Sequence, residues 1–512
     1  MRFTHWILHV SYLSTCVLAL HESTTKGQNP DTPVLKISRP LPSDDLHPFI
    51  RNVKEVNHLI KKYRSRGLPG PDFDEAETLA SVKRTIERRG TPVKRAPSYT
   101  IATGAQPTET DSMALEQDGN DISYLAAFEI GSGSTPLNLL IDTGAGDTWV
   151  MGSNCTTKSC QAHHVFNQTD SKSFSNTGKD FSIRYGTGSV SGVVVQDTIS
   201  FAGFSIKMAF GAADQASDDF LAYPQDGILG LGRKRDAAMG IPTVMEVLSS
   251  GDHITNSIFS VFIQREADSD SGEISFGTID DSRFEGDLAY TSTVSDSTMW
   301  EIPVDHAGAG GKNGDLSNKS AIIDTGTSYI LMPSDDAKEV LSQISGFSSN
   351  GDSFELPCTT NTPLQFTFSG SVFNVSSKDY LGGETGNGMC SVNVVGRQAF
   401  GPDQWILGDV FLKNVYAVFD LDKDQIGLAR KSTANPTRKA PSTKSGGASP
   451  TTSSSHTAAS NAATKTLQLA SSATSTTQQS ANQNSRSATH LLQVPWLLLS
   501  LSVLAPLGCL FG

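Results

Sequence analysis

Hydrophobic and polar residues alternate in many short stretches of the chain. Over residues 181–185 and 190–195, large apolar side chains are interleaved with small or polar ones. Such alternation is typical of β-strands that bury one face, and apolar repeats with the period of an α-helix are few. The 45 glycines suit the tight turns that such strands need. The pattern therefore predicts a mainly β protein.

Two short apolar runs, 139–141 and 321–323, are each followed directly by Asp-Thr-Gly, which begins at Asp142 and at Asp324. Each aspartate thus lies where a buried strand is predicted to turn at a glycine. One such triplet alone is compatible with an ordinary turn held by an aspartate side chain. The two copies in the same setting favour a shared role.

The surroundings of the two triplets repeat as well. Ile-Leu-Gly follows the first aspartate with Ile228 lying 86 residues downstream, and it follows the second with Ile406 lying 82 residues downstream. An aspartate turn followed at nearly equal distance by the same tripeptide indicates an internal duplication.

A pair of aspartates has a definite chemical use. A carboxylate is costly to bury alone, and two carboxylates held face to face cannot both ionise, so they share one proton. One can then act as a base while the other acts as an acid. These groups suffice to split an amide bond with water and without a covalent intermediate. Asp142 and Asp324 are therefore the predicted catalytic residues.

From about residue 121 to residue 430, the chain resembles the pepsin-like aspartic proteases. The resemblance is carried by the two aspartate turns, by a Tyr-Gly-Thr-Gly-Ser segment and by two segments near the end of the match. These segments are 142–150, 324–328, 185–189, 405–412 and 416–420. The resemblance implies a bilobal, mainly β fold with an internal duplication and a central active-site cleft, to which each lobe contributes one aspartate.

The resemblance also assigns roles to residues near the aspartates. Tyr185 belongs to the flap hairpin that closes over the substrate, and its hydroxyl is expected to bond the indole N–H of Trp149. Closure of the flap excludes water from the site. Thr143 and Thr325 are expected to brace the two turns from beneath.

Two further positions bear on acidity and specificity. Thr327, three residues beyond the second aspartate, offers a hydroxyl that favours the ionised carboxylate. The matching residue of the first turn is Ala145, where many relatives have serine, so we expect Asp142 to be harder to ionise. Thr187 in the flap overlooks the pocket for the side chain that precedes the scissile bond.

The N-terminal end predicts entry into the secretory pathway. Residues 1–19 combine one arginine with an apolar stretch that is too short to span a membrane and is followed by a polar segment, which is the pattern of a signal peptide. We expect the bilobal peptidase domain to occupy residues 96–430.

A basic leader precedes this domain. Residues 20–95 hold 15 Lys+Arg and 10 Asp+Glu, a net charge of +5, whereas residues 96–480 hold 23 and 43, a net charge of −20. Opposite charges attract the leader to the body, and its Lys-Lys-Tyr-Arg segment at 61–64 resembles the element that plugs the cleft in family zymogens. The leader ends at Lys94 and Arg95, a dibasic site suited to a kexin-type processing protease. A solvated arm without an inhibitory role remains the alternative to this propeptide.

The C-terminal end predicts a surface anchor. Residues 431–490 are rich in Ser, Thr, Ala, Gln and Asn and contain too few large apolar residues to form a core, as in an O-glycosylated stalk. Residues 491–512 are apolar and uncharged. With small residues from Ser480 and a polar spacer, they fit a GPI-attachment signal. Asn484 is a second candidate attachment point, and a retained membrane helix is the rival interpretation.

The cysteines fit an oxidising compartment. Two of the six lie in end segments that we expect to be removed, and the remaining four suggest two disulfides. Closeness in the sequence and the family pattern both favour Cys155–Cys160 and Cys358–Cys390, while the other two pairings stay open. No histidine pair lies at ligand spacing beside these cysteines, so a metal site is not expected.

Four N-glycosylation acceptor triplets point to the same compartment. They begin at Asn154, Asn167, Asn318 and Asn374. The acidic body argues against nucleic-acid binding. We also expect a monomer that acts on proteins and peptides and needs no cofactor.

Together these features predict a secreted aspartic endopeptidase that works at acid pH. It would be held by a GPI anchor at the extracellular face of the plasma membrane or in the cell wall, like the yapsin-like proteases of fungi. Two alternatives come from other classes: a catalytically inactive pepsin-fold binding protein, and a structural cell-wall glycoprotein whose stalk is the functional part.

The residue at position 187 predicts the specificity. An aspartate there could pair with a lysine ammonium, whereas the Thr187 hydroxyl offers only a neutral hydrogen bond of about half the strength. We expect cleavage after Phe, Leu or Met, although acidic residues within 214–219 could still recruit basic substrates. Thr187→Asp should add cleavage after lysine, and the neutral Thr187→Asn should not. Profiling on a peptide library checks this, and dominant cleavage after lysine or arginine by the unmodified enzyme would contradict it.

Overall fold

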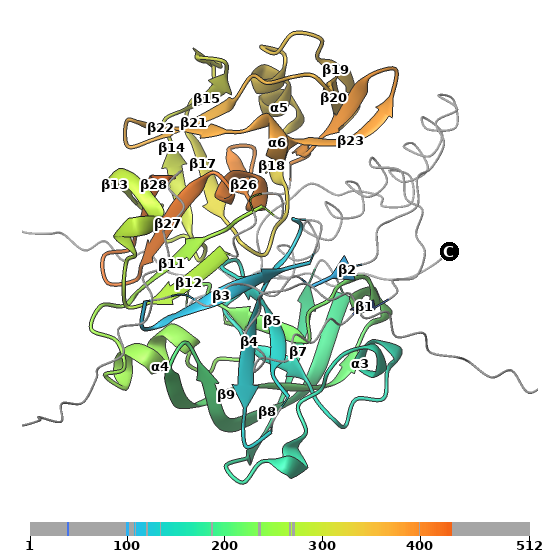
Figure 1. Ribbon diagram of the computed structural model, residues 1–512, viewed down its shortest axis with the longest axis vertical. Helices are drawn as coiled ribbons and strands as arrows, with labels where there is room; N and C mark the ends of the chain where they lie inside the picture. Colours follow the sequence, from blue (N-terminus) through green and yellow to red (C-terminus); the bar gives the residue numbers. More distant parts are fainter. Residues whose placement is uncertain are drawn as a thin grey trace, which may run out of the picture. The chain divides into compact units, whose positions relative to one another are not determined.

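A computed structural model of the chain gives the fold (Figure 1). The residues that it describes are 38–39, 99–101, 107, 109–118, 121–133, 135–185, 188–233, 237–265, 268, 272–398 and 400–432. The predicted signal peptide and anchor signal, and almost all of the predicted propeptide and stalk, lie outside these residues. So do four predicted site residues, Lys94, Arg95, Thr187 and Ser480.

β-strands dominate the described residues, which confirms the mainly β prediction. The largest sheet has 13 strands in the order β13-β28-β27-β11-β12-β3-β4-β5-β10-β6-β9-β8-β7 (Figure 1). Its strands are β3 (Ser112–Gln117), β4 (Tyr124–Ile130), β5 (Leu137–Asp142), β6 (Trp149–Met151), β7 (Ser175–Tyr185), β8 (Gly188–Phe201), β9 (Phe204–Ala216), β10 (Gly227–Gly230), β11 (Ile258–Phe262), β12 (Gly272–Phe276), β13 (Phe284–Ser292), β27 (Val415–Asp420) and β28 (Gln425–Lys431).

Smaller sheets complete the β-structure. A five-stranded sheet has the order β14-β17-β26-β18-β25, and its strands are β14 (Glu301–Val304), β17 (Lys319–Ile323), β26 (Gln404–Leu407), β18 (Ile330–Met332) and β25 (Val394–Gly396). Two four-stranded sheets consist of β16 (Lys312–Asn313), β15 (His306–Ala309), β21 (Leu364–Phe368) and β22 (Ser371–Val375), and of β19 (Ser348–Asn350), β20 (Ser353–Pro357), β24 (Met389–Val392) and β23 (Leu381–Gly386). β1 (Ser38–Arg39), in the predicted leader, pairs with β2 (Tyr99–Thr100), which lies just beyond it.

Helices are short in the described part of the chain. The α-helices are α3 (Lys158–Ala162), α4 (Val244–Ser250), α5 (Ser334–Leu341), α6 (Ser377–Tyr380) and α7 (Asp409–Leu412), and the 3-10 helices are η1 (Gln168–Asp170), η2 (Asp218–Ala222) and η5 (Asp281–Arg283). None of these helices has the length and apolar character needed to cross a membrane.

Strand pairing confirms the internal duplication. The strands β4-β5-β10-β6-β9 of the first half correspond in order to β14-β17-β26-β18-β25 of the second. In each half, the strand with Ile-Leu-Gly runs parallel to the strand that leads into the aspartate turn, so Leu229 pairs with Ile141 and Leu407 pairs with Ile323. The same strand runs antiparallel to the one that leaves the turn. Each Asp-Thr-Gly is therefore held between strands of its own half.

Aromatic packing ties the two repeats into one core. Phe259 and Phe419 stack with ring centroids 4.6 Å apart, and Trp300 meets both rings edge-on. The indole N–H of Trp300 donates to the carbonyl oxygen of Leu231, 2.9 Å away, next to the Ile-Leu-Gly of the first repeat. Burying one such aromatic side chain stabilises the fold by about 2–3 kcal/mol.

Both expected disulfides are formed. Cys155 is bonded to Cys160 and Cys358 to Cys390, across 5 and 32 residues of chain. In the loop-entropy model, the short loop contributes about 2 kcal/mol and the longer one about 4 kcal/mol. The short disulfide ties α3 to the loop that precedes it.

Candidate functional site

The two aspartates occupy corresponding and buried positions. Asp142 ends β5 and Asp324 directly follows β17, and their exposed fractions are 2% and 0%. The Gly144 N–H lies 2.9 Å from Oδ1 of Asp142 and 3.0 Å from Oδ1 of Asp324, so both carboxyl groups share this donor. The Gly326 N–H donates to Oδ1 of Asp324 over 2.9 Å. The two carboxyl groups, far apart in sequence, therefore meet in one site.

A reciprocal set of hydrogen bonds joins the two turns. The Thr143 N–H donates to the Thr325 hydroxyl and the Thr325 N–H to the Thr143 hydroxyl, each over 3.0 Å. The Thr143 hydroxyl donates to the carbonyl oxygen of Ile323 over 2.9 Å, and the Thr325 hydroxyl to that of Ile141 over 2.7 Å. Each bond contributes about 1 kcal/mol net, and losing one partner leaves a buried donor or acceptor unsatisfied. The threonines thus fix one turn against the other.

The close approach of the two turns explains why residue 326 is a glycine. A Cβ added to Gly326 would lie 2.3 Å from Oδ1 and 2.4 Å from Cγ of Asp142. Any larger residue would push the first carboxyl group away from the second turn. The Gly of the second triplet is therefore required by the Asp of the first.

The outer oxygens of the two carboxyl groups differ in their surroundings. The Thr327 hydroxyl donates to Oδ2 of Asp324 over 2.5 Å. Ala145, the matching residue of the first turn, is fully buried and has no hydroxyl to offer to Asp142. A hydrogen bond to a carboxylate favours its ionised form, so this contact favours a negative charge on Asp324.

A third buried acid lies close to the site, and the sequence analysis did not single it out. Asp409 is 1% exposed, and its backbone N–H donates to the carbonyl oxygen of Thr327 over 2.7 Å. Neither carboxyl oxygen has a hydrogen-bond partner in the described structure. Burial raises the pKa of Asp409 well above its usual range; the charge of Lys413 opposes the rise and that of Asp324 adds to it. The signal was present in the sequence, because this aspartate directly follows the second Ile-Leu-Gly.

The Tyr185 side chain is placed by the β7–β8 hairpin. Tyr185 pairs with Gly188 across the hairpin, whose tip residues 186–187 are not described. Its ring lies 6.1 Å from that of Trp149, which in turn meets Phe220 edge-on at 5.4 Å. These rings and Ala145 belong to one buried apolar cluster, so the flap residue and the first aspartate turn share a core.

One expectation about this cluster is wrong. The indole N–H of Trp149 is buried and has no hydrogen-bond partner in the described structure, so the bond that it was expected to donate to the Tyr185 hydroxyl is not formed. The two side chains instead pack ring against ring, with their planes tilted by 36°. Dispersion and burial hold the two rings together in this contact.

The remaining predicted sites lie away from the aspartates. The four acceptor asparagines are exposed on the surface: Asn154, Asn167, Asn318 and Asn374. Their glycosylation stays a prediction. Among the described residues, no group of three or more His, Cys, Asp and Glu side chains is arranged to hold a metal ion.

Known proteins with similar sequences share this site region. Residues 123–431 match the model of the family described as eukaryotic aspartyl protease. The chain is 41% identical over 367 residues to the probable aspartic-type endopeptidase CTSD of Trichophyton verrucosum, covering 71% of this chain and 72% of the relative. It is 42% identical over 361 residues to the aspartic-type endopeptidase ctsD of Aspergillus fumigatus, covering 70% and 76%. Cathepsin E-B of Xenopus laevis is 32% identical over 318 residues, or 60% of this chain and 79% of the relative.

The asymmetry between Ala145 and Thr327 predicts a pH effect. Ala145→Ser adds a donor beside Asp142, so the pair should lose its first proton more easily and the acidic limb of kcat/KM for peptide hydrolysis should move to lower pH. A hydrogen bond to a charged group is worth about 1.5–3 kcal/mol, which permits a shift of about one pH unit. Thr327→Ala should move the same limb to higher pH. If the acidic limb of kcat/KM lies at the same pH in both variants as in the unmodified enzyme, hydroxyl bonds to the outer carboxyl oxygens do not control the ionisation of the pair.

Proposed function

Since this chain belongs to the eukaryotic aspartyl protease family and is an aspartic-type endopeptidase, we propose that Asp142 and Asp324 together activate the attacking water. The observation that carries this proposal is the meeting of the two buried carboxyl groups at a shared Gly144 N–H. Two acids held this close share one proton. The pair therefore offers a base and an acid to the same peptide bond at acid pH.

The reaction proceeds through proton transfers to and from the pair. The ionised carboxylate removes a proton from a water molecule as its oxygen attacks the scissile carbonyl carbon, and the protonated partner gives its proton to the carbonyl oxygen, which completes the gem-diol intermediate. The pair then gives a proton to the leaving nitrogen as the C–N bond breaks. One gem-diol hydroxyl returns its proton to the pair as the new carboxyl group forms, so the pair is singly protonated again. The hydrogen bond from Thr327 supports Asp324 as the carboxylate that carries the charge.

The scaffold around the pair limits its motion. Thr143 and Thr325 hold the two turns in register, which keeps the carboxyl groups at the distance that sharing a proton requires. Tyr185, supported by Trp149, covers the bound peptide and keeps bulk water out. Thr187 lies outside the described residues; the family resemblance implies that it overlooks the pocket for the side chain before the scissile bond, with the preference for large apolar residues given above.

The enzyme acts at the cell surface. An N-terminal signal peptide, a basic leader ending at Lys94 and Arg95, a Ser/Thr-rich segment and an apolar C-terminal tail support secretion, processing by a kexin-type protease and attachment of a GPI anchor near Ser480. A tethered endopeptidase meets the proteins of its own surface first. Its role would then resemble that of the yapsin-like proteases, which trim surface proteins.

The two alternatives find less support. A binding protein with a pepsin fold has no need for two buried acids held at one donor, since burying a charge that does no chemistry is costly. A purely structural glycoprotein would not need the reciprocal threonine bonds either. The match to the eukaryotic aspartyl protease family covers residues 123–431, which carry both features.

Removing either carboxyl group tests the mechanism. Asp142→Asn and Asp324→Asn should each lower peptide hydrolysis by at least about 100-fold, because the remaining acid has no partner to share its proton. Asp281→Asn, which changes an exposed aspartate of η5, is the matched control and should keep full activity. Thermal unfolding of all three variants separates lost chemistry from lost folding. A folded variant of either active-site aspartate that retains substantial pepstatin-sensitive activity would refute the paired-acid mechanism.

The anchor is tested by releasing the enzyme from cells. Phosphatidylinositol-specific phospholipase C should free active full-length enzyme, and a chain ending at Ser480 should appear in the medium without treatment. Lys94→Ala with Arg95→Ala should give a longer and less active surface protein. Retention of the enzyme after cleavage of a control GPI-anchored protein on the same cells would favour the membrane-helix rival.

A further inference from the structure

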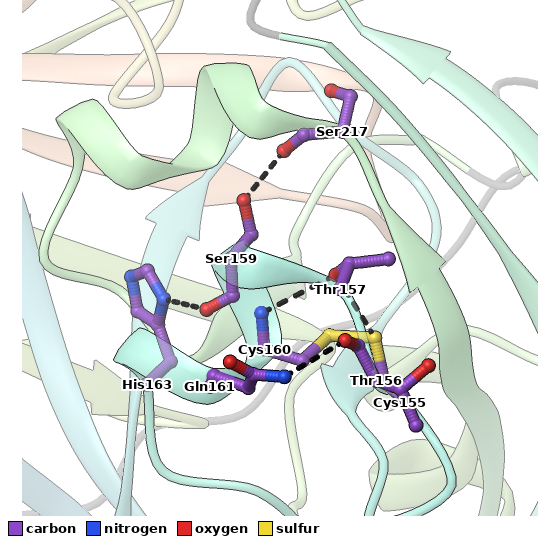
Figure 2. Close-up of a disulfide and its surroundings, with 8 residues drawn as sticks. All are labelled: Cys155, Thr156, Thr157, Ser159, Cys160, Gln161, His163 and Ser217. Carbon is purple, nitrogen blue, oxygen red and sulfur yellow. Dashed lines mark hydrogen bonds between the residues drawn. A yellow bond between two sulfur atoms is a disulfide. The ribbon is translucent and has the colours of Figure 1, made fainter.

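A histidine beside the short disulfide bridges two segments of the first repeat. His163 follows α3, and its Nδ1 lies 2.6 Å from the carbonyl oxygen of Ser159 in that helix (Figure 2). Its Nε2 lies 2.8 Å from the carbonyl oxygen of Tyr223, the residue that ends η2. The disulfide Cys155–Cys160 holds α3 in place on the other side of this contact.

Both hydrogen-bond partners of the His163 imidazole are carbonyl oxygens, so the number of protons on the ring decides how many of the two bonds it can form. A carbonyl oxygen only accepts hydrogen bonds, whereas a neutral imidazole has one N–H and one bare nitrogen. Neutral His163 can therefore satisfy only one of its two contacts, and its other lone pair faces an oxygen at close range. The imidazolium donates to both. The geometry thus selects the doubly protonated ring.

The segment held by His163 supports the start of β8 in the flap hairpin. The Ser189 N–H donates to the hydroxyl of Ser217 over 3.0 Å, and the Ser217 N–H donates to the Ser189 carbonyl oxygen, also over 3.0 Å. A Cβ on Gly188 would lie 2.1 Å from the Ser217 hydroxyl oxygen and 3.1 Å from the Phe220 ring. The start of β8, beside the tip of the hairpin, therefore rests directly on η2, whose Phe220 also packs on Trp149.

The same segment has a second tie that does not depend on pH. The Ser159 hydroxyl donates to the carbonyl oxygen of Ser217 over 2.7 Å, as Figure 2 shows. The start of η2 is thus fixed by a hydroxyl and its end by an imidazole. Losing the second proton of His163 would free only the end that carries Tyr223.

We propose that His163 is a positioning residue that, in its doubly protonated form, clamps η2 against the start of β8 in the β7–β8 hairpin and so favours substrate binding at acid pH. The inference rests on the proposed role of this hairpin as the flap. The clamp is complete only while both ring nitrogens carry a proton, and loss of one proton with rising pH opens one of its two bonds.

Other titratable groups surround the clamp and must be separated from it. Lys158 and Asp218 form an exposed ion pair at 3.6 Å between α3 and η2, and the Ser217 hydroxyl donates to Asp219 over 3.1 Å. The neighbouring His164 places Nδ1 at 3.2 Å from the buried carboxylate of Asp226. The phenol of Tyr223 completes the set. All of these groups remain in a variant changed only at His163, so they cancel in the comparison.

The test measures kcat and KM from pH 3.5 to 7 on the processed enzyme with one fluorogenic peptide. His163→Gln should raise KM about three- to tenfold at pH 4, with little change in kcat, because a neutral side chain cannot donate to both carbonyl oxygens. The ratio of variant to unmodified KM should fall towards one as the pH rises and the imidazole of the unmodified enzyme gives up its second proton. His164→Gln, at the adjacent histidine, is the matched control. The ratio of its KM to that of the unmodified enzyme should not change with pH.

Two further variants keep the outcomes distinct. Ser159→Ala removes the pH-independent tie, so its KM should rise more steeply with pH than that of the unmodified enzyme; this comparison decides the question even when His163→Gln does not fold. A KM ratio for His163→Gln that is constant with pH, or a Ser159→Ala profile parallel to that of the unmodified enzyme, overturns the clamp. Tyr185→Ala with unchanged kcat and KM would instead overturn the flap role on which the clamp rests.

Discussion

The exchange of hydrogen bonds between Thr143 and Thr325 is the contact on which the site depends. Each threonine supplies a donor and an acceptor to the opposite turn and a further bond to the strand that enters it. Four buried bonds therefore close a ring between two halves of the chain that are about 180 residues apart. Two ionised carboxyl groups repel each other, and this ring of hydrogen bonds holds the two turns together against that repulsion.

The duplicated fold puts the two aspartates in corresponding positions, but the surroundings of their carboxyl groups differ. The same five-strand arrangement brings each Asp-Thr-Gly to its turn. Differences between the copies then set the chemistry: Thr327 bonds one carboxyl group, Ala145 has no hydroxyl to offer to the other, and the buried Asp409 occurs only beside the second. At the corresponding place after the first Ile-Leu-Gly stands Leu231. One repeated motif can thus supply both an acid and a base. The repeat places the two carboxyl groups, and the residues that differ between the copies favour the charge on one of them.

The sequence predicted those features that depend on pattern and missed those that depend on side-chain direction. The repeated triplets and the spacing of Ile-Leu-Gly were sufficient to predict the duplication and the aspartate pair, and closeness in the sequence favoured the two disulfides that are formed. Whether the Trp149 indole meets a hydroxyl or a ring face depends on rotamers that no periodicity encodes, and that expectation was wrong. The two carbonyl oxygens that face His163 come from segments about 60 residues apart, so only the folded chain shows them.

The position of the last strand has a mechanical consequence. β28 lies between β27 and β13 and is antiparallel to both, and the side chain of its final residue, Lys431, bonds the carbonyl oxygens of Ile263 and Lys413. A pull on the chain beyond Lys431 acts along the axis of β28 and loads both ladders of hydrogen bonds in shear, all at once. Strands peeled from a sheet edge give way one bond at a time, whereas sheared strands must lose many bonds together. The last described strand is thus held on both sides, and two ladders of hydrogen bonds resist tension from the segment beyond it.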